Sequence, residues 1–228
     1  MPDGWRTRFL EITSDHEQYA DAAVLLRFCG LRPTELCKGV DVSFSTKGIK
    51  VRILGGKTRK TAGQPWRFFR LNSALLPKSF VDKVERAGKI KVAAEPDALR
   101  MYLRRISDQV FWPVDAKQAE SRNQAKSRNQ EYVLSAYTFR HALVTDLRDE
   151  GWKAETIAAA IGEVSADTVA YYGIRSGGRG KSPSSSAVLM NSVQAALPVR
   201  PSKMEGLDAL LAQKESAIVR SRFEQMTK

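Results

Sequence analysis

Two arginines and a tyrosine are the residues of this chain best suited to chemistry. Arg32 follows a Gly-Leu pair, Arg140 opens a helical pattern, and Tyr172 lies directly before a glycine. A guanidinium group is planar, permanently charged and able to bind two phosphate oxygens at once. A tyrosine oxygen can attack phosphorus as a nucleophile. The three residues together indicate phosphoryl transfer to a side chain.

Each of these residues also has a more ordinary interpretation. A single arginine is more often a surface or salt-bridge residue, and the pair Tyr171-Tyr172 is more often aromatic packing at a helix end. Tyrosine is also a weak nucleophile, because ionising a phenol at pH 7 costs about 4 kcal/mol. Nearby guanidinium groups, or a base that takes the proton during attack, would have to lower that cost. Glu35 lies one helical turn after Arg32 and is expected to orient a basic side chain.

The charge of the chain indicates a polyanionic partner. Its 228 residues carry a net charge of +12, with an isoelectric point near 9.8. Nucleic acid is the simplest partner for such a chain, and a basic protein without such a partner is the alternative. Hydrophobic residues make up 43% of the chain, which is enough for a packed core.

The cysteines and the apolar segments indicate the cellular compartment in which we expect the protein. Cys29 and Cys37 lack CxxC spacing, which argues against a zinc site or a disulfide scaffold and for a reducing compartment. The longest apolar run, 22–31, contains Arg27 and is too short to span a bilayer, and the N-terminus has no signal-peptide pattern. We therefore expect a cytoplasmic, nucleoid-associated protein without a membrane partner. No nucleotide-binding loop is present in the sequence, and no cofactor or metal is expected.

Hydrophobic periodicity predicts a mainly helical chain with one small antiparallel sheet, an α+β fold. Three strands are expected at 41–44, 49–54 and 66–71. The segment from Lys47 to Arg70 contains no acidic residue, so we expect it to bind the polyanion. Its candidate contacts are Lys47, Lys50, Arg52, Arg59, Lys60 and Arg67. Helices are expected at 16–29, 31–37, 75–87, 96–110, 139–150, 154–161 and 166–172.

The chain is expected to divide into a lead-in at 1–15, a main domain at 16–175, a linker at 176–186 and a tail at 187–228. The lead-in has little periodicity, and the linker is rich in glycine and serine. Residues 116–130 repeat Ser-Arg-Asn-Gln and are predicted to form a polar surface loop. The tail is expected to be helical, because its residues 207–219 carry an apolar stripe.

Several blocks of the sequence, taken in order, resemble the catalytic domain of the tyrosine recombinases, the phage-integrase family. Residues 30–36 (GLRPTEL) are similar to its first arginine box, and 54–60 (LGGKTRK) to the hairpin that carries its catalytic lysine. Residues 137–141 (YTFRH), 161–163 (IGE) and 168–172 (TVAYY) are similar to the box around its second arginine and its nucleophile. Each block alone is weak, but the ordered set is specific. The resemblance covers roughly residues 16 to 175.

The resemblance implies a role for each matched residue. Arg32 and Arg140 would bind the phosphate at the cleavage point. Tyr172 rather than Tyr171 would attack it, because Tyr172 has the family's spacing from the IGE block. Tyr171 and His141 would then have packing roles.

The proton-transfer positions of the family are only partly kept. Lys57 would protonate the 5′-oxygen leaving group, with Lys60 as the alternative if the hairpin shifts in register. Tyr137 stands where a histidine is usual, and a phenol can donate to phosphate but is a poor proton shuttle near neutrality. Glu163 stands where histidine or tryptophan is usual, and its carboxylate would repel the phosphate unless a basic side chain pairs with it or it is protonated.

The resemblance implies a site-specific recombinase or integrase of a mobile genetic element. Such an enzyme acts on double-stranded DNA through a 3′-phosphotyrosyl intermediate, without metal or ATP. It further implies a homotetramer on DNA, in which residues 187–228 dock on a neighbouring protomer. Accessory proteins and the target sequence are not given by the motifs. About fifteen residues precede the matched region, where the family usually has a DNA-clamping domain.

Two alternatives stay open. Tyr137 and Glu163 favour a homologue that binds DNA but has lost catalysis wholly or in part. The same chemistry would also suit a relaxing enzyme of the type IB topoisomerase kind.

Overall fold

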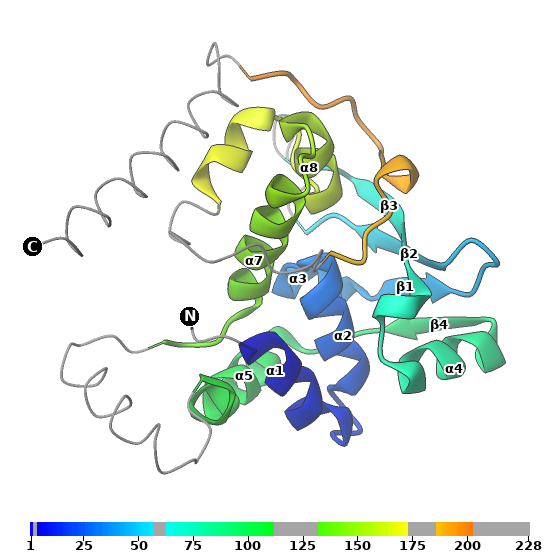
Figure 1. The fold of residues 1–228 in the computed structure, drawn as a ribbon, viewed down its shortest axis with the longest axis vertical. Helices are drawn as coiled ribbons and strands as arrows, with labels where there is room; N and C mark the ends of the chain where they lie inside the picture. Colours follow the sequence, from blue (N-terminus) through cyan, green and yellow to red (C-terminus); the bar gives the residue numbers. More distant parts are fainter. Residues whose placement is uncertain (2–3, 57–62, 112–131, 173–185, 203–228) are drawn as a thin grey trace, which may run out of the picture.

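The computed structural model describes residues 1, 4–56, 63–111, 132–172 and 186–202. It has the predicted α+β fold, in which helices pack on one five-stranded antiparallel sheet with the strand order β4-β1-β2-β3-β5 (Figure 1). Within these ranges, no helix has the length and apolar character needed to cross a membrane.

The centre of the sheet matches the prediction from the sequence. Strands β1 (Val40–Ser43), β2 (Ile49–Leu54) and β3 (Trp66–Leu71) pair in order and in antiparallel fashion. Along β2, buried and exposed residues alternate, as expected for a strand with one face on the core. Two edge strands, β4 (Lys89–Val92) and β5 (Gln194–Ala195), were not predicted. Both are short: β5 has two residues, and the polar–apolar alternation Lys-Ile-Lys-Val of β4 covers only four.

The helices also lie near their predicted positions, with ends that shift by a few residues. The α-helices are α1 (Trp5–Ser14), α2 (Ala20–Cys29), α3 (Pro33–Lys38), α4 (Lys78–Ala87), α5 (Pro96–Phe111), α7 (Ala136–Asp149) and α8 (Ala154–Ile161). Short 3-10 helices are η1 (Ser73–Leu75), η2 (Ala166–Tyr171) and η3 (Met190–Ser192).

The expected lead-in at 1–15 is instead an integral part of the fold. Helix α1 buries Trp5 and Phe9 against Phe139 of α7, with ring centroids 5.3 and 4.4 Å apart. Arg6 of α1 forms an ion pair with Asp146, also on α7. Trp5, Phe9 and Ile12 do have the i, i+4, i+7 spacing of a helix, a short signal that the prediction of a lead-in missed.

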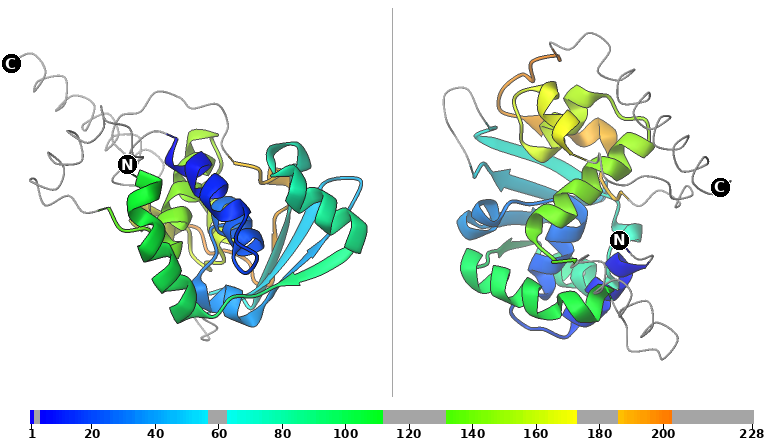
Figure 2. Two further views of the ribbon diagram at one scale, coloured as in Figure 1. Left: turned by 90° about the horizontal axis from the view of Figure 1, so that it is seen from below. Right: turned by 90° about the vertical axis from the view of Figure 1, so that its left-hand side faces the viewer.

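The elements form a helical part and a sheet part that share one core. Figure 1 shows the sheet and α4 on the right, α1, α5 and α7 on the left, and α2 and α3 between them. The left-hand view of Figure 2 shows the same separation from below. Helix α2 contacts both α1 and α7, while α3 and α8 contact β2 and β3 respectively. Helices α3 and α8 are therefore the bridge between the two parts.

The C-terminal tail differs from its prediction where it is described. Residues 187–202 contain η3 and β5 rather than a long helix, and Ala195 and Gln194 pair with Arg67 and Phe68 of β3. The predicted surface loop at 116–130, the linker at 176–185 and the apolar stripe at 207–219 lie outside the described residues.

Candidate active site

The α2–α3 junction presents Arg32. Gly30 ends α2 in the left-handed conformation at φ 56°, and a Cβ added there would lie 3.2 Å from the Cα of Arg140. A glycine is therefore needed both for the turn and for the close approach of α7. Arg32 then begins α3, where its backbone N–H donates to Glu35 Oε2 at 2.8 Å. The sequence predicted this pairing of Arg32 and Glu35, and it is confirmed.

Arg140 projects from the first turns of α7 and is completely buried. Its Nη1 donates to the carbonyl of Gly30 at 3.2 Å, and its Nη2 donates to the carbonyl of Ile161. These carbonyls belong to the ends of α2 and α8, where helix carbonyls lack intrahelical partners and carry partial negative charge. The guanidinium is thus held by two helix C-termini.

The side chains of Arg32, Arg140, Glu163 and Tyr172 meet at one point. Glu163 Oε1 accepts from Nη2 of Arg32 and from Nη2 of Arg140, the latter at 3.0 Å. The Tyr172 hydroxyl accepts from Arg140 Nε at 3.2 Å and donates to the same Glu163 oxygen at 3.4 Å. The structure therefore brings together four of the six predicted catalytic residues.

The two arginines stay charged despite their burial. Burial alone would lower the pKa of Arg32, but the carboxylates of Glu163 and then Glu35 outweigh it, so its pKa is raised. Burial, followed by the positive charge of Arg32, lowers the pKa of Arg140. The directions differ because Arg32 is less deeply buried and also contacts Glu35. A guanidinium remains protonated throughout the physiological range.

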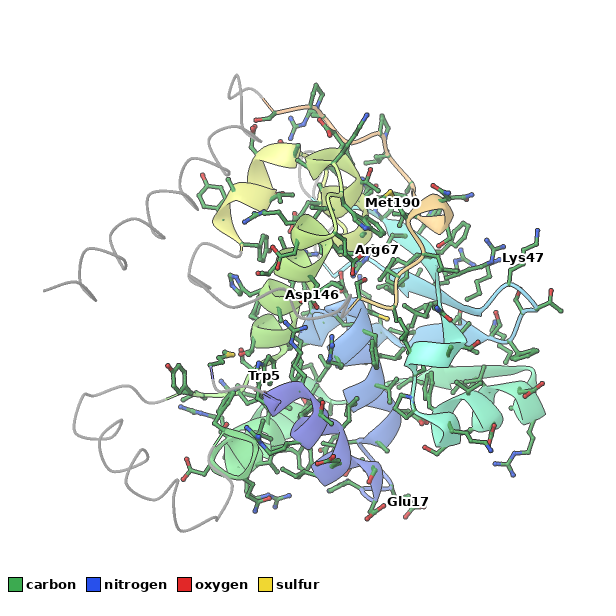
Figure 3. The ribbon with its side chains drawn as sticks, viewed as in Figure 1. Trp5, Glu17, Lys47, Arg67, Asp146 and Met190 are labelled. Atoms are coloured by element: carbon green, nitrogen blue, oxygen red, sulfur yellow. The ribbon has the colours of Figure 1, made fainter. Side chains whose placement is uncertain are left out.

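A fully buried ion pair between Arg67 and Glu35 holds the carboxylate that Arg32 contacts. Arg67 of β3 donates from Nη1 and Nη2 to the two oxygens of Glu35, at 2.7 and 3.0 Å, and from Nε to the carbonyl of Ala160 at 2.8 Å. Figure 3 shows Arg67 in the centre of the molecule, between the sheet and α8. Burial would raise the pKa of Glu35, but Arg67 lowers it to about 2.

Arg67 therefore corrects one sequence prediction. We expected it to contact a polyanion, but its side chain is completely buried and engaged by Glu35. The strand pattern contained the signal, because Arg67 shares the inner face of β3 with Phe69 and Leu71. Its function is to position Glu35, and through Glu35 the guanidinium of Arg32.

The two adjacent tyrosines have different environments. Tyr171 is 79% exposed, whereas Tyr172 packs its ring beside the His141 ring at 4.9 Å and lies beside the Arg140 guanidinium. Arg148 of α7 donates to the carbonyls of Val169 and Tyr172, which fixes this part of the chain. This geometry favours Tyr172 over Tyr171 as the site residue, and the exposed His141 contacts the Tyr172 ring.

Tyr137 lies one helical turn before Arg140 and is 43% exposed. With Pro33, Leu99 and Leu103 it lines an apolar cavity of about 230 Å³ beside the start of α3. Its hydroxyl is not part of the hydrogen-bonded cluster around Glu163 in the described structure. Its assignment as a phosphate ligand stays a prediction.

The predicted lysine hairpin is described only at its base. Gly56 lies so close to α3 that an added Cβ would be 2.2 Å from Thr34 Oγ1. The end of β2 thus runs directly beside the helix that Arg32 begins. Lys57, Arg59 and Lys60 follow, and all three lie outside the described residues.

The other predicted polyanion contacts are exposed. Lys50 and Arg52 lie on the outer face of β2, and Lys50 Nζ lies 5.1 Å from the Phe68 ring centroid. Lys47 lies in the β1–β2 turn, at the end of β2 opposite Gly56 and at the right-hand edge of Figure 3. The structure therefore leaves these three side chains available to an external partner but does not bring them to the arginine cluster.

Gln64 is a site residue that the sequence reasoning missed. It is buried, and its Nε2 donates to the carbonyls of Glu163 and Leu197 at 3.1 and 2.9 Å. The backbone N–H of Leu197 donates back to Gln64 Oε1 at 2.8 Å. No local pattern marks a buried glutamine in a turn, so only the tertiary structure identifies it as the anchor of the Glu163 backbone.

Comparison with known proteins gives structural neighbours alone. No family model and no curated protein sequence matches the chain. The crystal structure of XerA recombinase is similar with 14% identity and a TM-score of 0.44, covering 74% of this chain and 57% of that one. The Tn1549 transposon integrase in complex with transposon right end DNA has 17% identity and a TM-score of 0.36, covering 75% of this chain and 60% of that one.

The chain thus spans less than two thirds of the length of either neighbour. Both TM-scores are below 0.5, so the function proposed below depends on the geometry of the site itself. One neighbour is named a recombinase and the other a transposon integrase.

Proposed function

We propose that this chain cuts and rejoins double-stranded DNA through a covalent bond between Tyr172 and a DNA 3′ phosphate. One observation carries the proposal. The Tyr172 hydroxyl accepts a hydrogen bond from Arg140 and lies with both arginines around a single anion position. A nucleophile and two guanidinium groups that converge on one oxyanion are what attack on a phosphodiester requires.

The reaction follows from these positions. Arg32 and Arg140 neutralise the non-bridging oxygens, and the Tyr172 oxygen forms a bond to phosphorus as its proton passes to water. The bond from phosphorus to the 5′ oxygen breaks, and that oxygen takes a proton from Lys57, or from Lys60, as the sequence resemblance implies. A 5′ hydroxyl of another strand then reverses these steps and releases Tyr172. The phosphotyrosyl bond conserves the energy of the phosphodiester, so the scheme requires no ATP.

Trapping the covalent intermediate tests this proposal. Short duplexes with random flanking sequence would carry one central phosphorothiolate linkage with sulfur in place of the bridging 5′ oxygen. Because the released thiol rejoins poorly, a protein–DNA adduct should accumulate. Mass spectrometry should find the nucleotide on the tryptic peptide 154–175, which contains both Tyr171 and Tyr172.

The neighbouring tyrosines supply a matched control. Tyr172→Phe should abolish the adduct, whereas Tyr171→Phe should leave it within about twofold of the unsubstituted protein, because Tyr171 is exposed and outside the cluster. An adduct that forms equally well with Tyr172→Phe would disprove the assignment of the nucleophile.

A second candidate is a DNA-binding protein without cleavage activity. The Glu163 carboxylate favours it, because this group lies where the phosphate would have to bind. Salt-sensitive DNA binding without any adduct on the phosphorothiolate library would support this candidate over the first.

The partners of the reaction stay predictions. Double-stranded DNA is the proposed substrate, and assembly of a homotetramer on DNA is a further expectation. The apolar stripe at 207–219 that would mediate assembly lies outside the described residues.

A further inference from the structure

The arginine and tyrosine donors that converge on Glu163 already have partners within the protein. Arg140 has five N–H groups, and four of them donate to Tyr172, Gly30, Ile161 and Glu163. Two of these partners, Gly30 and Ile161, are backbone carbonyls in the packed core. An incoming anion can therefore gain the Nη2 donor of Arg140 only if Glu163 gives it up.

Two of the five N–H groups of Arg32 also donate to carboxylates of the protein. One of its Nη atoms donates to Glu35, at 3.3 Å, and the other donates to Glu163. Glu35 cannot move away, because both of its oxygens are also held by Arg67. Glu163 is thus the one acceptor of the described cluster that both arginines share and that the fold does not hold at both oxygens.

We propose that the Glu163 carboxylate is a tethered substitute for the phosphate and that a phosphate oxyanion binds by displacing it. A single carboxylate oxygen receives donors from Arg32, Arg140 and Tyr172. The two guanidinium groups are those that would hold a non-bridging phosphate oxygen, and the Tyr172 hydroxyl is the group that would attack the phosphorus. A phosphate placed beside an undisplaced Glu163 would meet like charge at close range and would find the donors occupied.

The backbone around Glu163 shows how the displacement would occur. The Glu163 N–H donates to the carbonyl of Ala158 at 2.8 Å, and its carbonyl accepts from Gln64 at 3.1 Å. The main chain is therefore fixed on both sides. The side chain is 13% exposed, so rotation about its own bonds can carry the carboxylate toward solvent while the arginines stay in place.

The proposal rests on the proposed function only for the identity of the anion as a DNA phosphate. Its test uses inorganic phosphate with the whole chain, so the two can fail separately. Phosphate is titrated into the protein by calorimetry, and the arginine Nε–H resonances are followed by NMR with ¹⁵N-labelled arginine. Glu163→Gln should bind phosphate at least tenfold more tightly than the unsubstituted protein, because it keeps the shape but removes the competing charge.

Two control variants test whether a gain in phosphate affinity comes from the arginine site. Glu155→Gln removes a carboxylate from the first turn of α8, outside the cluster, and should leave phosphate affinity within about twofold. Adding Arg32→Ala to Glu163→Gln should abolish the gain, because the anion then loses one of its two guanidinium ligands. If Glu163→Gln does not fold, Glu163→Asp takes its place, since the shorter side chain withdraws the carboxylate and should raise phosphate affinity by a smaller factor.

Equal phosphate affinity of the folded Glu163 variant and the unsubstituted protein would overturn the proposal. So would a gain of the same size in Glu155→Gln. A tenfold gain without any DNA adduct in the phosphorothiolate experiment would support the displaced carboxylate while the proposed function fails. A DNA adduct without a gain in phosphate affinity would support the proposed function and overturn the displacement of Glu163.

Discussion

At the scale of single residues, the carboxylates of Glu35 and Glu163 neutralise three buried arginines of the site. Glu35 is held by Arg67 at both oxygens, and Glu163 is shared by Arg32 and Arg140. An unpaired charge in such a site would be costly, because little water is present to solvate it. The Glu35–Arg67 pair therefore stabilises the fold, and the Glu163 carboxylate compensates the positive charge of Arg32 and Arg140.

The first prediction concerns the stability of this network in acid. Arg67 holds the pKa of Glu35 at about 2, well below its usual value of 4.5. Because the folded state binds this proton less readily than the unfolded state, the contribution to stability is complete above pH 4.5 and is lost as the pH falls toward 2. The contribution is on the order of 3 kcal/mol.

Urea unfolding at several pH values between 7 and 2.5 would measure it. Glu35→Gln should lose about 3–5 kcal/mol at pH 7, because it leaves a buried guanidinium without its charge partner. Its stability should then fall less steeply below pH 4.5 than that of the unsubstituted protein. Parallel pH profiles for the two proteins would contradict the assignment of this pKa to Glu35.

The residues of the site differed in how far the sequence could predict them. Arg32, Glu35, Arg140 and Tyr172 occur in spaced blocks, so their convergence could be expected. The assignment of Arg67 to an external partner was wrong, because a basic residue in a basic strand looks exposed until the inner face of the strand is known. Gln64 gave no signal, since its role depends on contacts with Glu163 and Leu197, which are distant in sequence.

At the scale of elements, the ends of helices bring the site together. Helix α2 ends at Gly30, α3 begins at Arg32, and α8 ends at Gly162, directly before Glu163. The carbonyls of Gly30 and Ile161 accept from Arg140. The site thus uses polar backbone groups that helix ends leave unpaired in any protein.

The second prediction tests the end of α8. Gly162 has φ 77°, and an added Cβ would lie 2.5 Å from Arg67 Nη1. Gly151 has φ 78° with no heavy atom within 4 Å of the added Cβ. Gly151→Ala should therefore cost only the backbone strain of about 1–2 kcal/mol. Gly162→Ala should cost more, because it also displaces the guanidinium that holds Glu35.

Thermal or urea unfolding of both variants would give the comparison. The difference between them isolates the contact with Arg67, because the backbone strain is nearly the same at the two glycines. Equal losses of stability would show that Arg67 can move aside freely, which would contradict its positioning role.

Element prediction from the sequence worked where one period dominated. The alternation in β2 and the apolar stripes of α7 and α8 gave their positions to within a few residues. Helix α1 was missed although Trp5, Phe9 and Ile12 follow helical spacing, because this signal spans only residues 5–12. Strand β5 was missed because two residues are too few to show a hydrophobic pattern. Its pairing with β3 is a contact between segments that are far apart in the sequence.

At the scale of the whole molecule, net charge and sheet geometry point to the same partner. Along β2 and β3, Lys50 pairs directly opposite Arg70 on the outer face of the sheet. Like charges in opposite positions destabilise a sheet slightly. Together with the net charge of +12, this arrangement is consistent with a surface whose counter-charge comes from a bound polyanion.

The third prediction is a change in the salt dependence of DNA binding. If Lys50 and Arg52 each contact a phosphate, the double variant Lys50→Ala/Arg52→Ala should lower the slope of log K against log salt by about 1.8. Fluorescence anisotropy with a labelled random-sequence duplex between about 50 and 200 mM KCl would measure the slope.

A matched control comes from α4. Arg86→Ala removes one exposed positive charge, where the double variant removes two, and it lies on α4, which packs against β4 and β1. It should change the slope by less than about half of one contact. An unchanged slope in the double variant would remove the outer face of β2 from the DNA-binding surface.

The shared carboxylate of Glu35 also limits how this chain can vary during evolution. Losing Arg67 alone would strand a buried negative charge, and losing Glu35 alone would strand a buried positive one. Either single change passes through a poorly folded intermediate, so the two codons are expected to be replaced together or not at all. An alignment of descendants and relatives should therefore show positions 35 and 67 as a covarying pair, although they lie on α3 and β3 and far apart in the gene.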